Sequence, residues 1–358
     1  MEKIRESVNK IGIARFIIGL FLLALFIAAP FAGISVKSSI ENVLARFGMF
    51  SILVLSLVPM IEAGCGLNFG IPIGIVAGIL GAVISLEFNL HGFAGIFVAM
   101  FVGILIGIAF GYIYGILLNK IIGDEMLIAT YVGYSFTAFM CILYLFLPFK
   151  NPVSVLSYGG KGLRQQIPVV DYWMKNIETA TGSIKSVGKL SNFLSFSIFG
   201  LTIPVGMLLF FVLMAFMIYA LFRSKTGTAM SVVGSNYEYA KASGINIKKV
   251  RLRAVILSTC IAAVGIIVYQ QSYGFIQLYQ APQAFTFQTV ASILIGGATL
   301  NKAKISHVII GTLLFQGIIT LTPTVINGLL SIDVSEVIRL IVTNGMIVYA
   351  LTRRIDND

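Results

Sequence analysis

No charged side chain interrupts the run GFAGIFVAMFVGILIGIAFGYIYGILL, which occupies residues 92–118. A helix needs about 20 mostly apolar residues to cross the hydrocarbon core of a bilayer, so this run is long enough to span a membrane. The whole chain has the same character: 58% of its 358 residues are hydrophobic, 11% are charged, and the mean hydropathy is +0.97. These values exclude an assembly of soluble domains and predict an integral membrane protein.

Apolar runs of similar character continue on both sides, and together they predict an all-α membrane protein with about ten transmembrane helices. The runs occupy residues 11–34, 47–63, 70–88, 92–118, 126–149, 201–222, 254–273, 287–300, 305–322 and 334–351. The runs that begin at residues 70 and 287 are rich in glycine or short. We therefore expect broken or re-entrant helices at these two places.

Basic residues at the ends of the runs predict the topology. Four of them lie at the start of the first run: Lys3, Arg5, Lys10 and Arg15. We therefore place the N-terminus in the cytoplasm, and ten crossings return the C-terminus, with Arg353 and Arg354, to the same side. On this threading the cytoplasmic segments hold about twice as many basic residues as the outer ones, which supports a multi-pass protein with both termini in the cytoplasm.

The same threading divides the single transmembrane domain, residues 1–358, into two halves. Residues 1–149 and 201–358 each supply five runs, with an extracytoplasmic loop at 150–200 between them and a cytoplasmic loop at 223–253 inside the second half. An odd number of crossings per half gives the halves opposite orientations in the membrane. The expected architecture is two five-helix halves of inverted topology.

The residues required by several other function classes are missing from the sequence. The formal net charge of +11 is concentrated at the ends of apolar runs, where it sets topology, so we expect no nucleic-acid partner. Cys65, Cys141 and Cys260 show no CxxC spacing, which argues against a zinc site or a disulfide framework. With two histidines, no HExxH motif and no phosphate-binding loop, the chain is predicted to be no enzyme and to carry no cofactor.

The cytoplasmic loop contains signals for a short helix. Ser235 followed three residues later by Glu238 is a capping-box pattern, and Gly244 is placed to end the helix in the left-handed conformation. An ordinary connector between two spans is the alternative. A connector needs no start and stop signals, however, whereas a helix that docks on another protein does.

The loop also carries a characteristic spacing of small and polar residues: Gly227, Gly234, Asn236, Ala240, Ser243, Gly244 and Ile245. With this spacing it resembles the cytoplasmic coupling loop of bacterial ABC-importer permeases of the ribose, simple-sugar and nucleoside type, within the branched-chain amino acid and ribose permease superfamily. Residues 291–300, with Gly296, Gly297 and Thr299, and residues 115–130, with Asn119, are similar to two further family segments in the same order.

The resemblance implies a function, partners and coupling residues. In that family the loop inserts into a separate ATP-binding-cassette subunit, which binds ATP and Mg. The chain is thus expected to be a permease subunit in the lipid of the bacterial inner membrane. It would pair with a second permease, identical or homologous, and receive solute from an extracytoplasmic solute-binding protein. The coupling residues implied are Gly234, Ser235, Asn236, Glu238, Ala240, Ser243 and Gly244.

Three residues are predicted to line the translocation path. Asn68 and Phe69 lie in a glycine-rich stretch that permits an unwound backbone beside a cavity, and an amide in hydrocarbon without a partner is costly. Close helix packing is the alternative role of these glycines. Glu62 is an acid at the end of an apolar run, which marks either a path residue or a carboxyl group that bonds a neighbouring helix.

The solute and the energy source remain open at this stage. The sugar-type permeases show an acid and a serine where this chain has Gly66 and Asn68, whereas the triplet formed by Asn68, Phe69 and Gly70 is closer to the nucleoside type. Monosaccharides and nucleosides are therefore both candidates. A secondary transporter or channel driven by an ion gradient is the alternative from another class, with Glu62 as its main coupling group.

Overall fold

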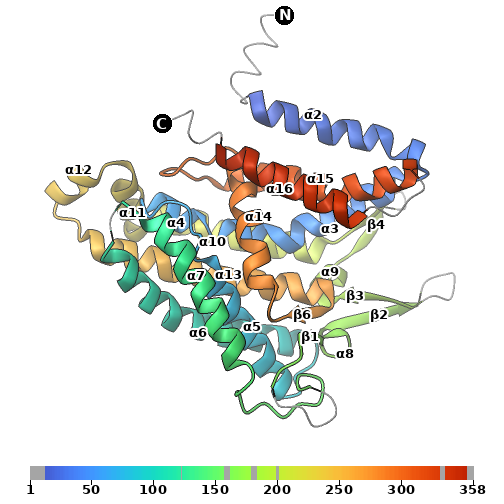
Figure 1. The fold of residues 1–358 in the computed structure, drawn as a ribbon, viewed down its shortest axis with the longest axis horizontal. Coiled ribbons are helices and arrows are strands. Elements are labelled where there is room, and N and C mark those ends of the chain that lie inside the picture. The colour runs from blue at the N-terminus through green and yellow to red at the C-terminus, as the bar shows by residue number, and fades with distance from the viewer. Residues whose placement is uncertain are drawn as a thin grey trace, which may run out of the picture.

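A computed structural model describes residues 13–121, 123–156, 162–178, 184–198, 201–330 and 335–352 (Figure 1). Each predicted apolar run corresponds to a helix, so the all-α membrane fold is confirmed. These helices are α2 (Ile13–Ala28), α3 (Val36–Leu55) with α4 (Val58–Glu62), α5 (Ile71–Glu87), α6 (Gly92–Asn119), α7 (Glu125–Leu143), α10 (Val205–Arg223), α13 (Ile247–Tyr273), α14 (Ala281–Ile295), α15 (Ile305–Leu330) and α16 (Ser335–Thr352). The basic residues predicted to set topology at positions 3, 5, 10, 353 and 354 lie outside the described residues.

Within the described residues, six helical segments are long and apolar enough to cross a membrane. They are Val36–Glu62, Gly92–Asn119, Glu125–Leu143, Val205–Arg223, Ile247–Tyr273 and Ile305–Leu329. Parts of α2, α5 and α16 are apolar but shorter. The chain is therefore a multi-pass membrane protein whose helices differ in length.

Helix α5 lies at the centre of the bundle. Most of its residues are buried, and it packs against α6, α7, α13 and α14. By contrast, only 22% of the most apolar 18-residue stretch is buried in each of α7 and α10, and 33% of that stretch is buried in α6. These three helices therefore present apolar faces to the surroundings of the chain, which are lipid or another subunit.

The expected broken or re-entrant helices at the runs that begin at residues 70 and 287 correspond to two short helices, α14 with 15 residues and α5 with 17, and α5 itself runs without a break. Its glycines serve close packing instead: a Cβ on Gly74 would lie 2.7 Å from the Thr259 carbonyl oxygen of α13, and one on Gly78 would lie 2.4 Å from that of Ala263. The unwound backbone lies just before the helix, in a turn at residues 63–70 where Gly64 and Gly66 have positive φ. We call this segment the buried turn.

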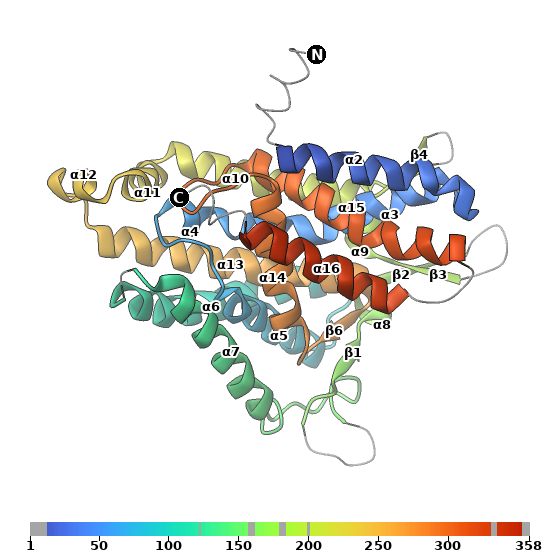
Figure 2. The same ribbon diagram turned by 45° about the horizontal axis from the view of Figure 1, so that its top comes forward.

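The helix ends gather at two opposite ends of the molecule. One end carries α11 (Lys225–Ser235) and α12 (Tyr237–Ala242), which extend beyond the bundle in both views (Figures 1 and 2). Side-chain bonds join other segments there, including Asn119 to Lys248, Glu125 to Arg251 and Glu62 to Ala303. All of these segments are cytoplasmic in the predicted threading, so their grouping agrees with its alternation of sides.

The opposite end contains more regular structure than the loop predicted at 150–200. Short antiparallel pairs join β1 (Gln166–Pro168) to β6 (Phe275–Gln277), β2 (Met174–Glu178) to β3 (Ile184–Gly188), and β4 (Phe196–Ile198) to β5 (Leu201–Ile203). Two four-residue helices, α8 (Val170–Trp173) and α9 (Lys189–Asn192), lie between them, and Trp173 is fully buried. This segment is therefore partly folded onto the helix ends.

The helix packing relates the two predicted halves. Helix α6, the fourth of the first half, packs on α13, the second of the second half, and α15 packs on α3 in the corresponding way. Likewise, α5 contacts α7 as α14 contacts α16. This reciprocal arrangement is what two halves of inverted topology would give. The boundary at residues 149 and 201 stays a prediction.

Candidate functional site

The loop predicted to couple the chain to a partner is a pair of short helices. Helix α11 ends at Ser235 and α12 follows after one residue, Asn236, whose Oδ1 accepts a hydrogen bond from the Tyr239 amide at 2.9 Å. Asn236 is therefore the N-cap of α12. The predicted capping box is wrong in this respect, because the Ser235 hydroxyl donates back to the Val232 carbonyl.

The end of α12 matches the prediction for Gly244, which has φ +74°. The Ile245 amide donates to the Ala240 carbonyl and the Gly244 amide to that of Lys241, a pattern that satisfies the last carbonyls of the helix. Among residues 235–244, only Ala240 is buried. The segment, including Glu238 and Ser243, is thus a capped helix held by one packed side chain, with almost all of its surface uncovered.

Glu62 lies where α11 meets two other segments. Its Oε2 accepts a hydrogen bond from the Ser231 hydroxyl of α11 at 3.0 Å, and its Oε1 accepts one from the Ala303 amide at 2.8 Å. Ala303 belongs to the loop between α14 and α15. Of its two predicted roles, the structure shows the carboxyl group bonded to neighbouring segments.

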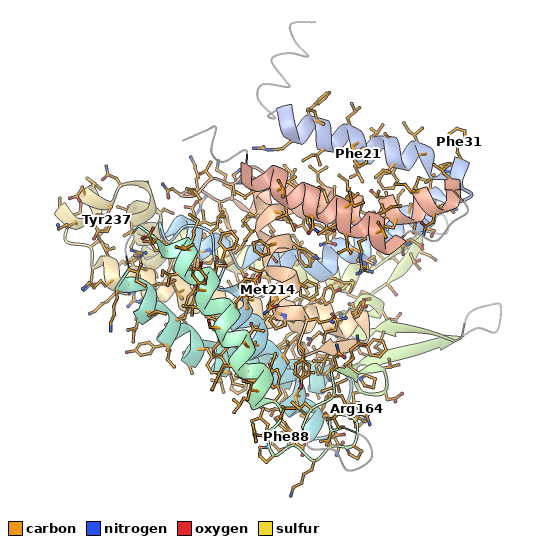
Figure 3. All side chains as sticks on the ribbon, viewed as in Figure 1. Phe21, Phe31, Phe88, Arg164, Met214 and Tyr237 are labelled. Carbon is orange, nitrogen blue, oxygen red and sulfur yellow. The ribbon has the colours of Figure 1, made fainter. Side chains whose placement is uncertain are left out.

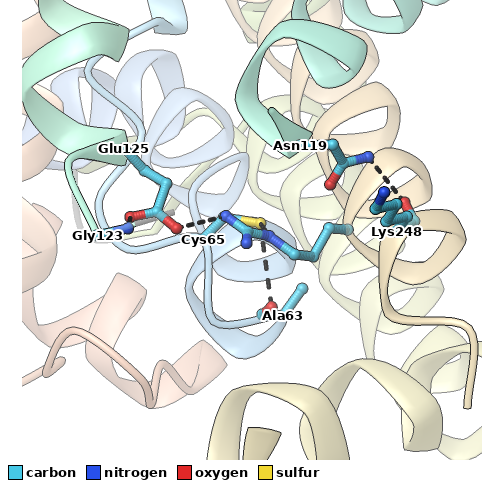
Figure 4. Close-up of polar contacts among 7 residues, drawn as sticks. Ala63, Cys65, Asn119, Gly123, Glu125 and Lys248 are labelled. Atoms are coloured by element: carbon cyan, nitrogen blue, oxygen red, sulfur yellow. Dashed lines mark hydrogen bonds and ion pairs between the residues drawn. The ribbon is translucent and has the colours of Figure 1, made fainter. Parts of the chain in front are cut away.

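A buried ion pair lies next to the buried turn, where Figure 4 shows Glu125 beside Cys65. Arg251 in the second turn of α13 contacts Glu125 at the start of α7, with 2.6 Å between Nη2 and Oε1. Its Nε donates to the Cys65 sulfur at 3.4 Å, and the second Glu125 oxygen accepts from the Gly123 amide. Burial raises the pKa of the Cys65 thiol, so Glu125 is the group that balances the arginine charge.

Asn68 is buried, and both the nitrogen and the oxygen of its side-chain amide make hydrogen bonds. Its Nδ2 donates to the Ser258 hydroxyl of α13 at 3.0 Å, and its Oδ1 accepts from the Tyr114 hydroxyl of α6 at 3.1 Å. The sequence alone names no partner for the Asn68 side chain, and the structure shows that its amide joins the buried turn to two helices. Such a network stabilises the turn whatever its relation to the path.

Phe69 belongs to an aromatic row that crosses three segments. Its ring lies 5.8 Å from that of Phe287 in α14, which lies 6.4 Å from that of Tyr134 in α7. Neither α14 nor the rest of α7 beyond Glu125 carries a charged residue. The row is thus an uncharged aromatic wall next to the buried turn.

Sequence reasoning missed Arg251, Glu125 and Ser231. Arg251 is assigned to the basic loop because the apolar run is taken to begin at residue 254, whereas α13 begins at Ile247. The available signal is Asn246, whose side chain caps α13 by accepting from the Lys249 amide. Among the described residues, no group of three His, Cys, Asp or Glu side chains is placed to hold a metal ion.

Known proteins are similar to this chain in sequence. Residues 39–351 match the family described as branched-chain amino acid transport system / permease component. The chain is 30% identical over 155 residues to the probable ABC transporter permease protein YphD of Escherichia coli K12, and 29% identical over 165 residues to the autoinducer 2 import system permease protein LsrC of E. coli SMS-3-5. These matches cover 43% and 46% of this chain, and they span 45% of each relative.

Proposed function

The chain belongs to the family of branched-chain amino acid transport system permease components, and we propose that it is the translocation subunit of an ATP-driven importer. In this proposal it lies in the bacterial inner membrane with both termini in the cytoplasm. ATP and Mg are bound by a separate ATP-binding-cassette subunit. This chain supplies the path for the solute and the surface on which the ATPase acts.

Helix α12 is the observation that carries the proposal. It is capped at both ends and lies beyond the helix bundle, and Tyr237 and Tyr239 are 41% and 63% exposed. Tyr237 lies at the opposite end of the molecule from Phe31 (Figure 3). A short helix that is rigidly capped yet uncovered fits a docking element, since exposed aromatic side chains are frequent anchors at protein interfaces.

The solute proposed is an uncharged polar molecule with a ring, such as a monosaccharide or nucleoside. The aromatic row of Phe69, Phe287 and Tyr134 offers faces for such a ring, and α14 adds the exposed amide of Gln283. A zwitterionic amino acid would need charged partners once it is out of water. The uncharged wall therefore favours the neutral solutes over branched-chain amino acids.

Two further partners follow from the uncovered surfaces. The apolar faces of α6, α7 and α10 suit a second permease subunit as well as lipid. The segment between α7 and α10 at the opposite end carries basic residues, among them Lys150, Arg164 and Lys189. We expect them to attract an acidic surface of an extracytoplasmic solute-binding protein, an attraction that added salt would weaken.

Reconstitution in proteoliposomes tests the proposal. The chain is reconstituted with an ATP-binding-cassette subunit and a solute-binding protein from its own host, and uptake of labelled monosaccharides and nucleosides is measured. Uptake that requires both ATP and the ATPase subunit is the expected result. Uptake that follows a proton or sodium gradient without the ATPase would instead establish the secondary-transporter alternative.

A further inference from the structure

Three segments that are distant in the sequence meet at the carboxylate of Glu62. They are the end of α4, the helix α11 that precedes α12, and the loop that precedes α15. Each carboxylate oxygen accepts one hydrogen bond, from Ser231 in one case and from the Ala303 amide in the other. Each oxygen therefore bonds a different segment, and the side chain of Glu62 joins all three at one point.

The backbones at the same point are in direct contact. A Cβ on Gly234 would lie 2.3 Å from the Glu62 carbonyl oxygen, and a Cβ on Gly64 would lie 3.0 Å from Gly234 Cα. Only glycine permits this approach of α11 to the end of α4. Packed backbones transmit displacement with little slack, because protein interiors are dense and poorly compressible.

On the α11 side, this contact leads directly to α12. Asn236 ends α11 and caps α12, so no flexible linker separates the two helices. A force on the exposed surface of α12 therefore reaches Ser231 and Gly234 within about two helical turns.

On the other side, the contact leads into the bundle. Glu62 is followed by the buried turn, which holds Phe69 and continues into α5, and Ala303 is followed by α15. Helices α5 and α15 are extensively buried, and they belong to different predicted halves. One carboxylate thus connects the exposed helix to both halves of the transmembrane bundle.

We infer that Glu62 is a positioning residue that makes α11 with α12, the buried turn and the α14–α15 loop move as one body. This inference rests on the proposed function. It gives Glu62 a role in transmitting force in place of its predicted role in lining the solute path. Displacement of α12 by the ATPase would then shift α5 and α15 together. Removing the carboxylate would let α12 move while the path stays closed.

The test measures solute transported per ATP hydrolysed in the proteoliposomes described above. Glu62→Ala removes both bonds, Ser231→Ala removes one, and Glu62→Gln keeps an acceptor for Ala303 and a donor for Ser231. The matched control is Glu87→Ala at the opposite end, where a carboxylate at the end of α5 accepts from the amides of Lys150 and Asn151.

We expect Glu62→Ala, which loses both hydrogen bonds, to keep ATP hydrolysis but to lower the transport ratio by about tenfold. Ser231→Ala should lower it less, while Glu62→Gln and Glu87→Ala should stay near wild type. A wild-type ratio in assembled Glu62→Ala overturns the inference. If that variant does not assemble, Ser231→Ala decides in the same way, with a reduced ratio supporting the inference and an unchanged ratio overturning it.

The same assay separates this inference from the proposed function. Wild-type protein that shows no ATP-dependent uptake overturns the importer proposal and the inference together. Wild-type protein that couples uptake to ATP, alongside a Glu62→Ala variant that couples equally well, overturns the inference alone.

Discussion

Helix α12 and the buried turn lie near the same end of the molecule but are held in opposite ways. In α12 the backbone is capped at both ends, and Ala240 is the one buried residue of the segment at 235–244. In the buried turn, Cys65 and Asn68 are both bonded to other helices. The difference indicates that α12 is built to present a surface, whereas the turn is built to hold a position.

Substitution at the ion pair tests the rigidity of the turn and should give the largest effect. Arg251→Met leaves the Glu125 carboxylate buried without its cation, which typically costs about 3–5 kcal/mol. We expect a lower thermal unfolding midpoint in detergent, and a double variant that also carries Glu125→Met should recover most of the loss. The control is Arg253→Met, two residues along α13, where the side chain is exposed.

An intermediate effect is expected for Asn68→Leu. The change leaves the hydroxyl groups of Tyr114 and Ser258 without this partner in the core, at about 1–3 kcal/mol for each group left unbonded. Thermal unfolding of the purified protein measures the loss, and Tyr114→Phe, which removes one bond, should lose less. An unchanged midpoint together with an altered solute preference would return Asn68 to the solute path and contradict its role in holding the turn.

The smallest effect is expected in α12 itself. Asn236→Ala removes the N-cap and should weaken the helix by about 1 kcal/mol, whereas Ser235→Ala should change little because its hydroxyl bonds within α11. Hydrogen exchange of the amides in 237–242 measures both variants. Faster exchange in Ser235→Ala than in Asn236→Ala would favour the capping box expected from the sequence over the observed cap.

Features that depend on neighbouring residues are predictable from this sequence. The ten apolar runs, the unwound segment around Gly64 and Gly66, and the helix end at Gly244 all follow from composition and local backbone preference. The predicted N-cap of α12, Ser235, is one residue too early, because Asn236 is the observed cap. Both side chains are suitable acceptors, and only the position of α11 decides between them.

Features that depend on distant contacts are not predictable in this way. The partners of Glu62 lie 169 and 241 residues along the chain, and Glu125 lies 126 residues from Arg251. A single sequence records the charge of Arg251 but not its pairing, so hydropathy assigns it to a loop. Likewise, the glycines of α5 indicate either an unwound backbone or close packing, and only the position of α13 shows that they serve packing.

Site-specific photo-cross-linking tests whether α12 docks on an ATPase. A benzophenone side chain is placed at Tyr239, which is 63% exposed, and at Phe88, 69% exposed at the opposite end, as the control. After irradiation of host membranes, adducts are identified by mass spectrometry. We expect position 239 to capture a subunit with a GxxxxGK[ST] phosphate-binding motif and position 88 to capture none. A variant that still supports uptake but yields no ATPase adduct at position 239 would contradict the docking of α12.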